Sequence, residues 1–534
     1  MVFLSAPIPI SGYFLLNFSL RTFPQTLPMT ASNISTADFL QQSGVEDILQ
    51  DLRDYFKNNN KELIVSDVTD AQGNQYVDLV QEGGGVLGIA LVGYTYVLEK
   101  MGIRFFSMAG TSAGSINAML LACSGNKEEE KSGTITDHLV KLQMFSFVDG
   151  IPGKNAFTRF IQRTVSGMLM GKNPIKKIFN LVKWTVISLL TLTILSFIAN
   201  FIWPGIAKWI GLAAGLSLLL FVVIVIVGVT RFKSFAKNGY GLNEGKVFHD
   251  WIRDLISSFH IQNDPAQKKI GNYADFSLHF MNIPELNVKP DTRRTNNLPP
   301  HMPMLTLITC DIIANRKIEF TQMWDLYWNK QEDVHPGDFV RASMSIPVFF
   351  ESFTLNNIRK KSSFATWDKH LNWQNEKKNI PDTVQFIDGG TLSNFPINVF
   401  YNPNYPVPRM PTFGIRLQDG VLDAANRSNN TFSGYIASLF ATIRFNFDRD
   451  FITKNRAYNM GVKNIDVQEH NWLNFFMEDK EKIALFRKGA LAAADFLKNF
   501  DWNNYKEQRL KNFEMQQERF ENPNNMKVFP YSNT

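Results

Sequence analysis

Cysteine is almost absent from this chain of 534 residues, which contains only Cys123 and Cys310. Two cysteines in apolar stretches do not form the disulfide framework of a small secreted protein, so we expect both to fill the core in a reducing compartment. The eight histidines are scattered and lack the spacing of a metal-ligand cluster. We therefore expect neither disulfides nor a metal centre.

A strong excess of one charge is also missing. The formal net charge is +6, which gives no reason to expect a nucleic-acid partner but suits an anionic membrane surface. Hydrophobic residues make up 45% of the chain and charged residues 19%, as in folded proteins. The composition does not indicate an oligomeric state.

Charge is absent from two long runs, WTVISLLTLTILSFIANFIW (184–203) and WIGLAAGLSLLLFVVIVIVGVT (209–230). Each has the roughly 20 apolar residues that cross a bilayer, with tryptophans at the ends. We expect a transmembrane helical hairpin over residues 178–235, and the alternative is a buried pair of core helices. Lysines and arginines flank the hairpin and only Lys208 lies in its turn, so the flanking regions, with the catalytic domain, are expected in the cytoplasm.

The first 74 residues are expected to form a partly disordered segment with one helix, Thr36–Asn60. The apolar start lacks a basic region and contains Pro7 and Pro9, so it is a poor signal peptide. Translation begins at Met1 or at Met29 in this interpretation.

A serine between glycines follows the strand-like run IRFFSMAG. The stretch GTSAG, with Gly110, Ser112 and Gly114, then leads into the apolar helix SINAMLLACSG. Gly-x-Ser-x-Gly between a strand and a helix is typical of a nucleophile elbow, although small residues also cluster in ordinary turns. Because QYVDLVQ also leads through a glycine turn into a helix, the repeated pattern predicts an α/β fold with a parallel sheet.

The glycine turn EGGGVLG (82–88) matches Gly-x-Gly-x-x-Gly. A dinucleotide site needs an acidic residue about 20 residues later, at the end of the second strand, and MAGTSAG has none. The alternative is an anion cradle: backbone N–H groups at a helix start suit an oxyanion hole. We assign this role to Gly83, Gly84, Gly85 and Val86.

A serine nucleophile needs a base. His470 follows Asp388 in the order of a Ser–His–Asp triad, but its surroundings carry no signature. The segment FIDGG (386–390) ends a strand at Asp388, followed by Gly389 and Gly390, and by itself is also compatible with an ordinary Asp-Gly turn.

Together and in this order, the three motifs resemble those of the patatin-like phospholipase family of bacterial type. The matching residues are Gly83, Gly84, Gly85 and Gly88; Gly110, Ser112 and Gly114; and Asp388, Gly389 and Gly390. RASMSIPVFFES and NFPI are also similar to the family. The resemblance implies a three-layer α/β sandwich with a central, mostly parallel sheet over residues 75–417, interrupted by the hairpin. Residues 418–534 are expected to form a helical region and a polar tail.

The resemblance also implies a Ser–Asp dyad without histidine, metal or cofactor. Ser112 would attack an ester carbonyl, and Asp388 would accept its proton and later activate water. A water-poor site would raise the carboxyl pKa and make Asp388 a better base. Two positions depart from the family: Glu82 replaces an aspartate, and Leu87 replaces an arginine or lysine. We expect reduced or altered activity from the lost positive charge.

The resulting expectation is a membrane-anchored serine lipid acyl hydrolase of the phospholipase A or lysophospholipase type. Its partners would be the bilayer and a phospholipid or lysophospholipid, from which it releases fatty acid. Two alternatives remain open at this point. An acyltransferase would use the same acyl-enzyme, and a non-catalytic membrane scaffold would keep only the fold.

Overall fold

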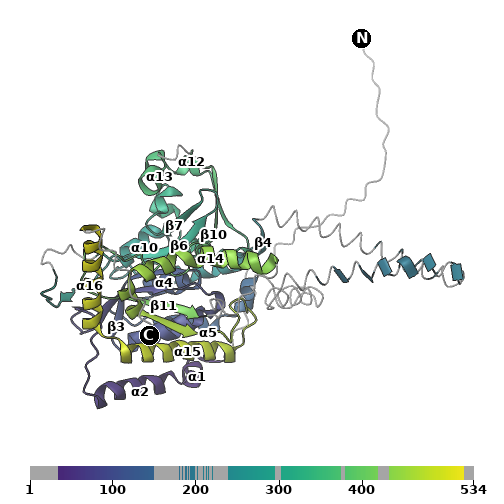
Figure 1. Cartoon of the computed structure of the whole chain (residues 1–534). Helices are drawn as coiled ribbons and strands as arrows, with labels where there is room; N and C mark the ends of the chain where they lie inside the picture. The colour runs from purple at the N-terminus through teal and green to yellow at the C-terminus, as the bar shows by residue number, and fades with distance from the viewer. Residues whose placement is uncertain are drawn as a thin grey trace, which may run out of the picture.

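A mixed sheet of ten strands organises the residues described by the computed structural model, which are 34–148, 239–294, 302–374, 379–418 and 432–521, with isolated helical positions between 180 and 219 (Figure 1). Along its main path the strand order is β12-β11-β2-β3-β6-β10-β9. The strands from β12 to β6 run parallel, whereas β10 and β9 are antiparallel to their neighbours. The predicted α/β fold with a mostly parallel sheet is therefore confirmed.

The strands of this sheet are short and largely buried. They are β1 (Val68–Thr69), β2 (Gln75–Gln81), β3 (Ile103–Thr111), β5 (Asn287–Val288), β6 (Leu305–Asp311), β7 (Arg316–Phe320), β9 (Phe353–Asn356), β10 (Thr383–Asp388), β11 (Thr412–Gln418) and β12 (Val462–Asp466). A separate pair joins β4 (Gly241–Asn243) and β8 (Val348–Phe350).

Alternating side chains give the sheet two apolar faces. In β2, Val77 and Leu79 belong to the main core, whereas Tyr76 and Val80 belong to two smaller clusters. Most helices contribute to the main core, whereas α14 and the turn η7 pack on the side of Val80. Helices thus cover both faces, as in a three-layer arrangement.

The helices of the main core include those next to the predicted motifs. They are α1 (Thr36–Ser43), α2 (Val45–Asn58), α3 (Ile89–Lys100), α4 (Ala113–Cys123), α5 (Ser132–Lys141), α9 (Lys246–Ile256), α10 (Tyr273–Phe280), α11 (Pro336–Ser343), α13 (Phe364–Leu371) and α15 (Asp479–Asn499). The remaining helices and helical turns are η1 (Gly85–Gly88), η2 (Met144–Val148), η3 (Trp324–Leu326), η4 (Gln331–Asp333), α12 (Ile358–Lys361), η5 (Gly389–Thr391), α14 (Phe432–Lys454), η7 (Arg456–Gly461) and α16 (Trp502–Glu521).

The single helix predicted over Thr36–Asn60 is wrong, because the structure has two helices there. Gly44 separates α1 from α2 with a φ of 63°, in the left-handed region that favours glycine. Arg487 of α15 donates to the carbonyl of Ser43 at 2.7 Å, so the break also lets α15 reach the end of α1.

Beyond residue 417 the sequence predicts helices, and the structure adds a strand. β12 pairs in parallel with β11 and extends the sheet, and α15 packs along α3. The region after 417 therefore shares the sheet and the main core of the preceding residues.

The two uncharged runs at 184–203 and 209–230 lie largely outside the described residues, as do residues 1–33 and 522–534. Their described positions, such as Trp184 and Phe201, are helical and exposed. Among the residues that the structure does describe, no helix combines the length and the apolar character needed to span a bilayer.

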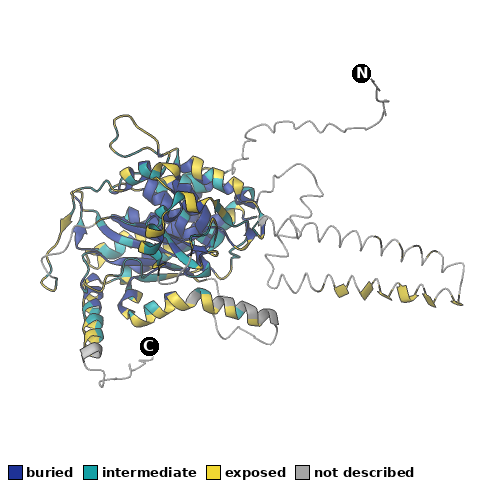
Figure 2. Cartoon of the chain, turned by 90° about the horizontal axis from the view of Figure 1, so that it is seen from above, coloured by how far each residue is buried: buried dark blue, intermediate teal, exposed yellow. Residues whose placement is uncertain are grey.

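The elements on either side of residues 149–238 pack against each other. Phe147 of η2 contacts Phe248 and Trp251 of α9, each with ring centroids 5.1 Å apart. Buried residues concentrate in the sheet and the adjoining helices, to which η2 and α9 belong (Figure 2). The two elements that flank this segment in the sequence therefore contact each other in the main core.

Candidate active site

Ser112 occupies a strained turn between β3 and α4. Its φ is 52° and its ψ is −118°, a conformation that costs about 1–3 kcal/mol for a residue with a side chain. Such a turn lifts the serine side chain away from strand and helix alike, as in a nucleophile elbow. Ser112 is only 3% exposed, so its hydroxyl faces a site largely closed to water.

Close backbone approach explains the glycines around Ser112. A Cβ on Gly110 would collide with the backbone of Gly114, and one on Gly114 would collide with the carbonyl of Gln81. At Gly88, a Cβ would lie 2.8 Å from that of Ala113. The glycine loop and the elbow therefore pack against each other, which requires residues without side chains.

Asp388 reaches Ser112 from the other side of β6. In the sheet, Thr111 pairs with Ile308, and the next residue of β6, Thr309, pairs with Asp388. The end of antiparallel β10 therefore lies level with the end of β3. The Ser112 side chain lies close enough to the Asp388 carboxyl to lower its pKa, so the structure brings the two predicted residues together.

The environment of Asp388 changes its basicity. Burial raises the pKa of this carboxyl above its ordinary value, although the hydrogen bond from Ser112 opposes the shift. The N–H of Gly390 also donates to Asp388 Oδ1 at 2.7 Å, which orients the carboxylate. Because ionisation is disfavoured, the ionised carboxylate is a stronger base than an exposed aspartate.

The glycine loop offers fewer free donors than the sequence predicts. The N–H of Gly83 donates to the carbonyl of Asn394 at 3.0 Å, and that of Val86 to the carbonyl of Trp472 at 3.0 Å. Within the described part of the chain, the N–H groups of Gly84 and Gly85 have no acceptor. The four predicted oxyanion donors thus reduce to two.

The two departures from the family pattern have distinct surroundings. Leu87 is fully buried in the main core, so an apolar contact replaces the expected charge. Glu82 Oε2 accepts the N–H of Leu417 at 2.7 Å, and Glu82 Oε1 accepts Asn394 Nδ2 at 3.2 Å. Burial raises the pKa of Glu82 to about 7, although the charge of Arg416 opposes the shift.

Asn394 connects the glycine loop to the segment after Asp388. Besides Glu82, its Nδ2 donates to the carbonyl of Gly83 at 3.0 Å, and its own carbonyl accepts the N–H of Gly83. The motif NFPI contains this residue, but its resemblance to the family did not reveal a connecting role. Asn394 thus holds the loop and the Asp388 segment in one arrangement.

Ser343 and Ser345 are further residues that the sequence did not single out. Ser343 Oγ accepts the backbone N–H of Ser112 at 3.0 Å and donates to the carbonyl of Ile308 at 2.6 Å. The carbonyl of Ser345 accepts the N–H of Asp388 at 2.8 Å. Their only sequence signal was the stretch RASMSIPVFFES at the end of α11.

His470 takes no part in this arrangement. Its Nδ1 lies 3.1 Å from Glu481 Oε1, and among the described residues its Nε2 is buried without a hydrogen-bond partner. The open alternative of a Ser–His–Asp triad is therefore not the geometry found: His470 pairs with Glu481, whereas Ser112 pairs with Asp388.

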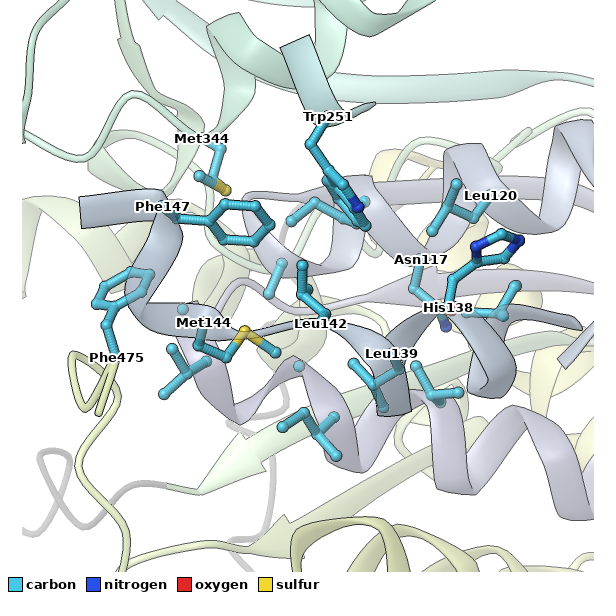
Figure 3. Close-up of a pocket in the computed structure, with 18 of the residues that line it drawn as sticks. Asn117, Leu120, His138, Leu139, Leu142, Met144, Phe147, Trp251, Met344 and Phe475 are labelled. Atoms are coloured by element: carbon cyan, nitrogen blue, oxygen red, sulfur yellow. The ribbon is translucent and has the colours of Figure 1, made fainter. Parts of the chain in front are cut away.

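An apolar cavity of about 80 Å³ begins next to the elbow. Gly85 and Val86 of the glycine loop and Ala113, the residue after Ser112, contribute to its wall. Further wall residues include Phe147 of η2, Trp251 of α9 and Met344, which directly follows α11 (Figure 3). The reactive hydroxyl thus lies beside a space suited to hydrocarbon.

Comparisons with known proteins identify the family of the chain. The model of the patatin-like phospholipase family matches residues 79–401, more than half of the chain. The uncharacterized protein YqhO of Bacillus subtilis (strain 168) is 22% identical over 427 residues, covering 80% of this chain and all of that protein. The crystal structure of VipD from Legionella pneumophila is similar over 82% of this chain and 71% of VipD, with 12% identity and a TM-score of 0.34. From the extent of the family match, the chain belongs to the patatin-like phospholipase family and is a lipid hydrolase.

Proposed function

We propose that the chain is a membrane-anchored serine acyl hydrolase of the phospholipase A or lysophospholipase type, which releases fatty acid from glycerophospholipids. The observation that carries the proposal is that the buried side chains of Ser112 and Asp388 lie close together beside the glycine loop, at the level ends of β3 and β10. The family match supports the reaction class, and the apolar cavity supports an acyl substrate.

In the first step, Ser112 Oγ attacks the ester carbonyl carbon while Asp388 takes the hydroxyl proton. The N–H groups of Gly84 and Gly85, which have no acceptor among the described residues, donate to the oxyanion. The carbon–oxygen bond to the alcohol then breaks. Asp388 returns the proton to the leaving alcohol, and the acyl group stays on Ser112.

In the second step, a water molecule attacks the acyl-enzyme. Asp388 accepts a proton from this water and passes it to Ser112 Oγ as the acyl bond breaks. The fatty acid leaves and the enzyme returns to its starting state. Asp388 thus acts as base and acid in turn, which suits a carboxyl whose pKa burial raises.

The membrane part of the proposal rests on the sequence. The uncharged runs at 184–203 and 209–230 are each long enough for one span, and basic residues flank the pair. A hairpin of this kind would hold the active site close to its insoluble substrate, with the catalytic domain in the cytoplasm.

A fluorophosphonate probe and a lipid panel test the reaction. We expect the probe to label the wild type and not Ser112→Ala, and the wild type to release fatty acid from phospholipids or lysophospholipids. Asp388→Asn should lower kcat by about 10²–10⁴-fold, the usual contribution of a general base, whereas His470→Ala should retain most activity. A folded wild type without labelling, or an inactive His470→Ala with an active Asp388→Asn, would contradict the proposal.

A further inference from the structure

The apolar cavity follows two helices away from Ser112. On the α4 side its wall contains Ala113, Ile116 and Leu120, and on the α3 side Gly85, Ile89 and Val92. These positions recur every three or four residues, so each set lies along one helix face. The cavity is therefore an elongated groove that starts at the elbow and runs between the two helices.

The length of the groove follows from helix geometry. Ala113 and Leu120 are two turns apart, which places about 10 Å of groove along α4. His138 and Leu139 of α5 lie near Leu120, at the opposite end from Met344 and Phe475 (Figure 3). The His138 ring packs edge-on against Phe259, with centroids 6.1 Å apart, so α5 marks the far end of the groove.

The mostly apolar side chains of the groove wall favour an uncharged hydrocarbon ligand. Its polar side chains are Asn117 and His138. Asn117 Nδ2 donates to Gln81 Oε1 at 2.7 Å, and burial lowers the pKa of His138, which keeps that ring neutral near pH 7. Among the residues that the structure describes, the groove thus offers no charged partner for a head group.

We propose that this groove binds the acyl chain of the ester rather than its alcohol portion, and that recognition of the chain ends after about eight carbons. A hydrocarbon chain of ~1.5 Å bonds advances about 1.25 Å per carbon, so about 10 Å of groove holds roughly eight carbons. Carbons beyond this number extend past Leu120 and His138, the last residues of the groove lining. The assignment rests on the proposed function, because it takes Ser112 as the acylated residue.

Esters of one alcohol with acids of increasing length test this assignment. We use p-nitrophenyl esters from acetate to palmitate, with active enzyme counted by fluorophosphonate labelling. Each methylene that enters the groove should raise kcat/KM by up to about fourfold, the equivalent of its transfer from water. The rise should level off near eight carbons. A kcat/KM that does not depend on acyl length would overturn the assignment.

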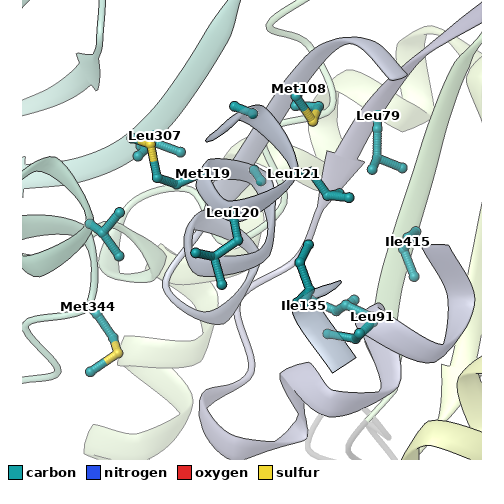
Figure 4. Packing of buried hydrophobic residues seen from close by; sticks show 14 of the residues in the cluster. Leu79, Leu91, Met108, Met119, Leu120, Leu121, Ile135, Leu307, Met344 and Ile415 are labelled. Atoms are coloured by element: carbon teal, nitrogen blue, oxygen red, sulfur yellow. The ribbon is translucent and has the colours of Figure 1, made fainter. Parts of the chain in front are cut away.

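Leu120→Phe places bulk at the far end of the groove. Figure 4 shows Leu120 on a different side of α4 from Met119 and Leu121, which pack towards the sheet. We expect Leu120→Phe to lower kcat/KM for octanoate and longer acids by tenfold or more relative to that for butyrate. Leu491→Phe, exposed on α15 and outside the wall, is the matched control. Equal losses for all acids would contradict the assignment.

A second series separates the two halves of the ester. Acetates of alcohols of increasing length keep the acyl group constant, so Leu120→Phe should not change their relative rates. A selective loss for long alcohols would instead assign the groove to the leaving group and overturn the proposal. Val92→Phe introduces the same bulk from α3 and replaces Leu120→Phe if that variant does not fold.

Failure of this assignment differs from failure of the proposed function. If no ester is hydrolysed and the probe labels nothing, the hydrolase itself is rejected, and the acyl assignment with it. If Ser112 is labelled and esters are hydrolysed without the expected chain-length pattern, only the groove assignment is rejected.

Discussion

Ser112 and Asp388 share one support at the end of α11. The hydroxyl of Ser343 holds the backbone of Ser112, and the carbonyl of Ser345, two residues later, holds the backbone of Asp388. Arg341 Nη1 in turn donates to Ser345 Oγ at 2.6 Å. A single short segment therefore sets the spacing between the hydroxyl and the carboxylate by holding the backbone of both residues.

Ser343→Ala tests this positioning role. The change leaves the N–H of Ser112 without its acceptor in a strained turn, and one buried hydrogen bond of this kind corresponds to roughly a tenfold effect or more. We expect kcat to fall by roughly tenfold with KM unchanged, whereas Ser343→Thr, which keeps the hydroxyl, should recover much of the loss. Steady-state kinetics on a soluble ester, together with Tm, provide the measurement. A folded Ser343→Ala with normal kcat would exclude the role.

The raised pKa of Glu82 should make the stability of the protein depend on pH. Burial raises its pKa to about 7 in the folded protein, above the value in the unfolded chain. The folded state therefore holds more protons between the two values, and this contribution to stability is complete at low pH and lost as pH rises through 7. Asp78 has a similarly raised pKa of about 7, so wild-type data alone cannot isolate Glu82.

Comparison with Glu82→Gln isolates the contribution. The difference in free energy of unfolding between wild type and Glu82→Gln should change by roughly 3 kcal/mol from pH 4 to pH 8, to the disadvantage of the wild type. Urea unfolding at several pH values measures it. Parallel pH profiles of the two proteins would show that the Glu82 carboxyl does not titrate in this way.

Among the helices, α3 and α15 approach closely because each has a glycine at the contact. A Cβ on Gly93 would meet the backbone of Phe486, and a Cβ on Gly489 would meet the backbone of Ala90. The neighbouring side chains Leu485 and Ala490 are fully buried. The helix after β12 is thereby packed directly on the helix that follows the glycine loop.

Gly489→Leu tests the importance of this helix contact. The added side chain has backbone on its far side rather than a movable group, so overpacking should cost about 3 kcal/mol, at the upper end of the usual range. Leu491→Ala, at an exposed position of the same helix, should change stability by less than about 0.5 kcal/mol. Urea midpoints compare the two. Equal effects would show that the close crossing is unimportant for stability.

Local patterns of apolar residues and glycines predicted the elements around the motifs, because strand, glycine turn and helix follow one another directly in the sequence. The strands ending at Thr111 and Asp388 and the helix α4 were found from such runs. The antiparallel direction of β10 and the pairing of β12 were not predicted, since both depend on partners far away in the chain. Ser343 was not predicted for the same reason, because its hydroxyl accepts the N–H of Ser112, which is far away in the chain.

Considered as a whole, the protein carries residues 149–238 between two elements that pack together. Phe147 before the segment and Trp251 after it are in ring contact, and both line the groove beside Ser112. The sheet strands β2 and β3 precede the segment, and β6 and β10 follow it. The segment thus connects two parts of one sheet, and the ring contact between Phe147 and Trp251 holds its two flanking elements together.

Replacement of residues 149–238 by a Gly/Ser linker of about ten residues tests the proposed anchor. A flexible linker of this length spans roughly 15–20 Å, so the contact between η2 and α9 can form. We expect the shortened protein to leave the membrane fraction while the fluorophosphonate still labels Ser112. Ser112→Ala in the same background controls for the labelling. A shortened protein that stays in the membrane fraction would contradict anchoring by this segment.

The two segments that form the active site are synthesised at different times during translation. Thr111, beside the reactive serine, donates a hydrogen bond to the carbonyl of Ser393, 282 residues further along the chain. At the usual 5–20 residues per second of translation, the ribosome makes the second partner roughly 15–60 s after the first. The uncharged runs leave the ribosome within this interval. In the anchored enzyme that we propose, a nascent chain would meet the bilayer before Asp388 is synthesised, so it would not hydrolyse lipid until that point.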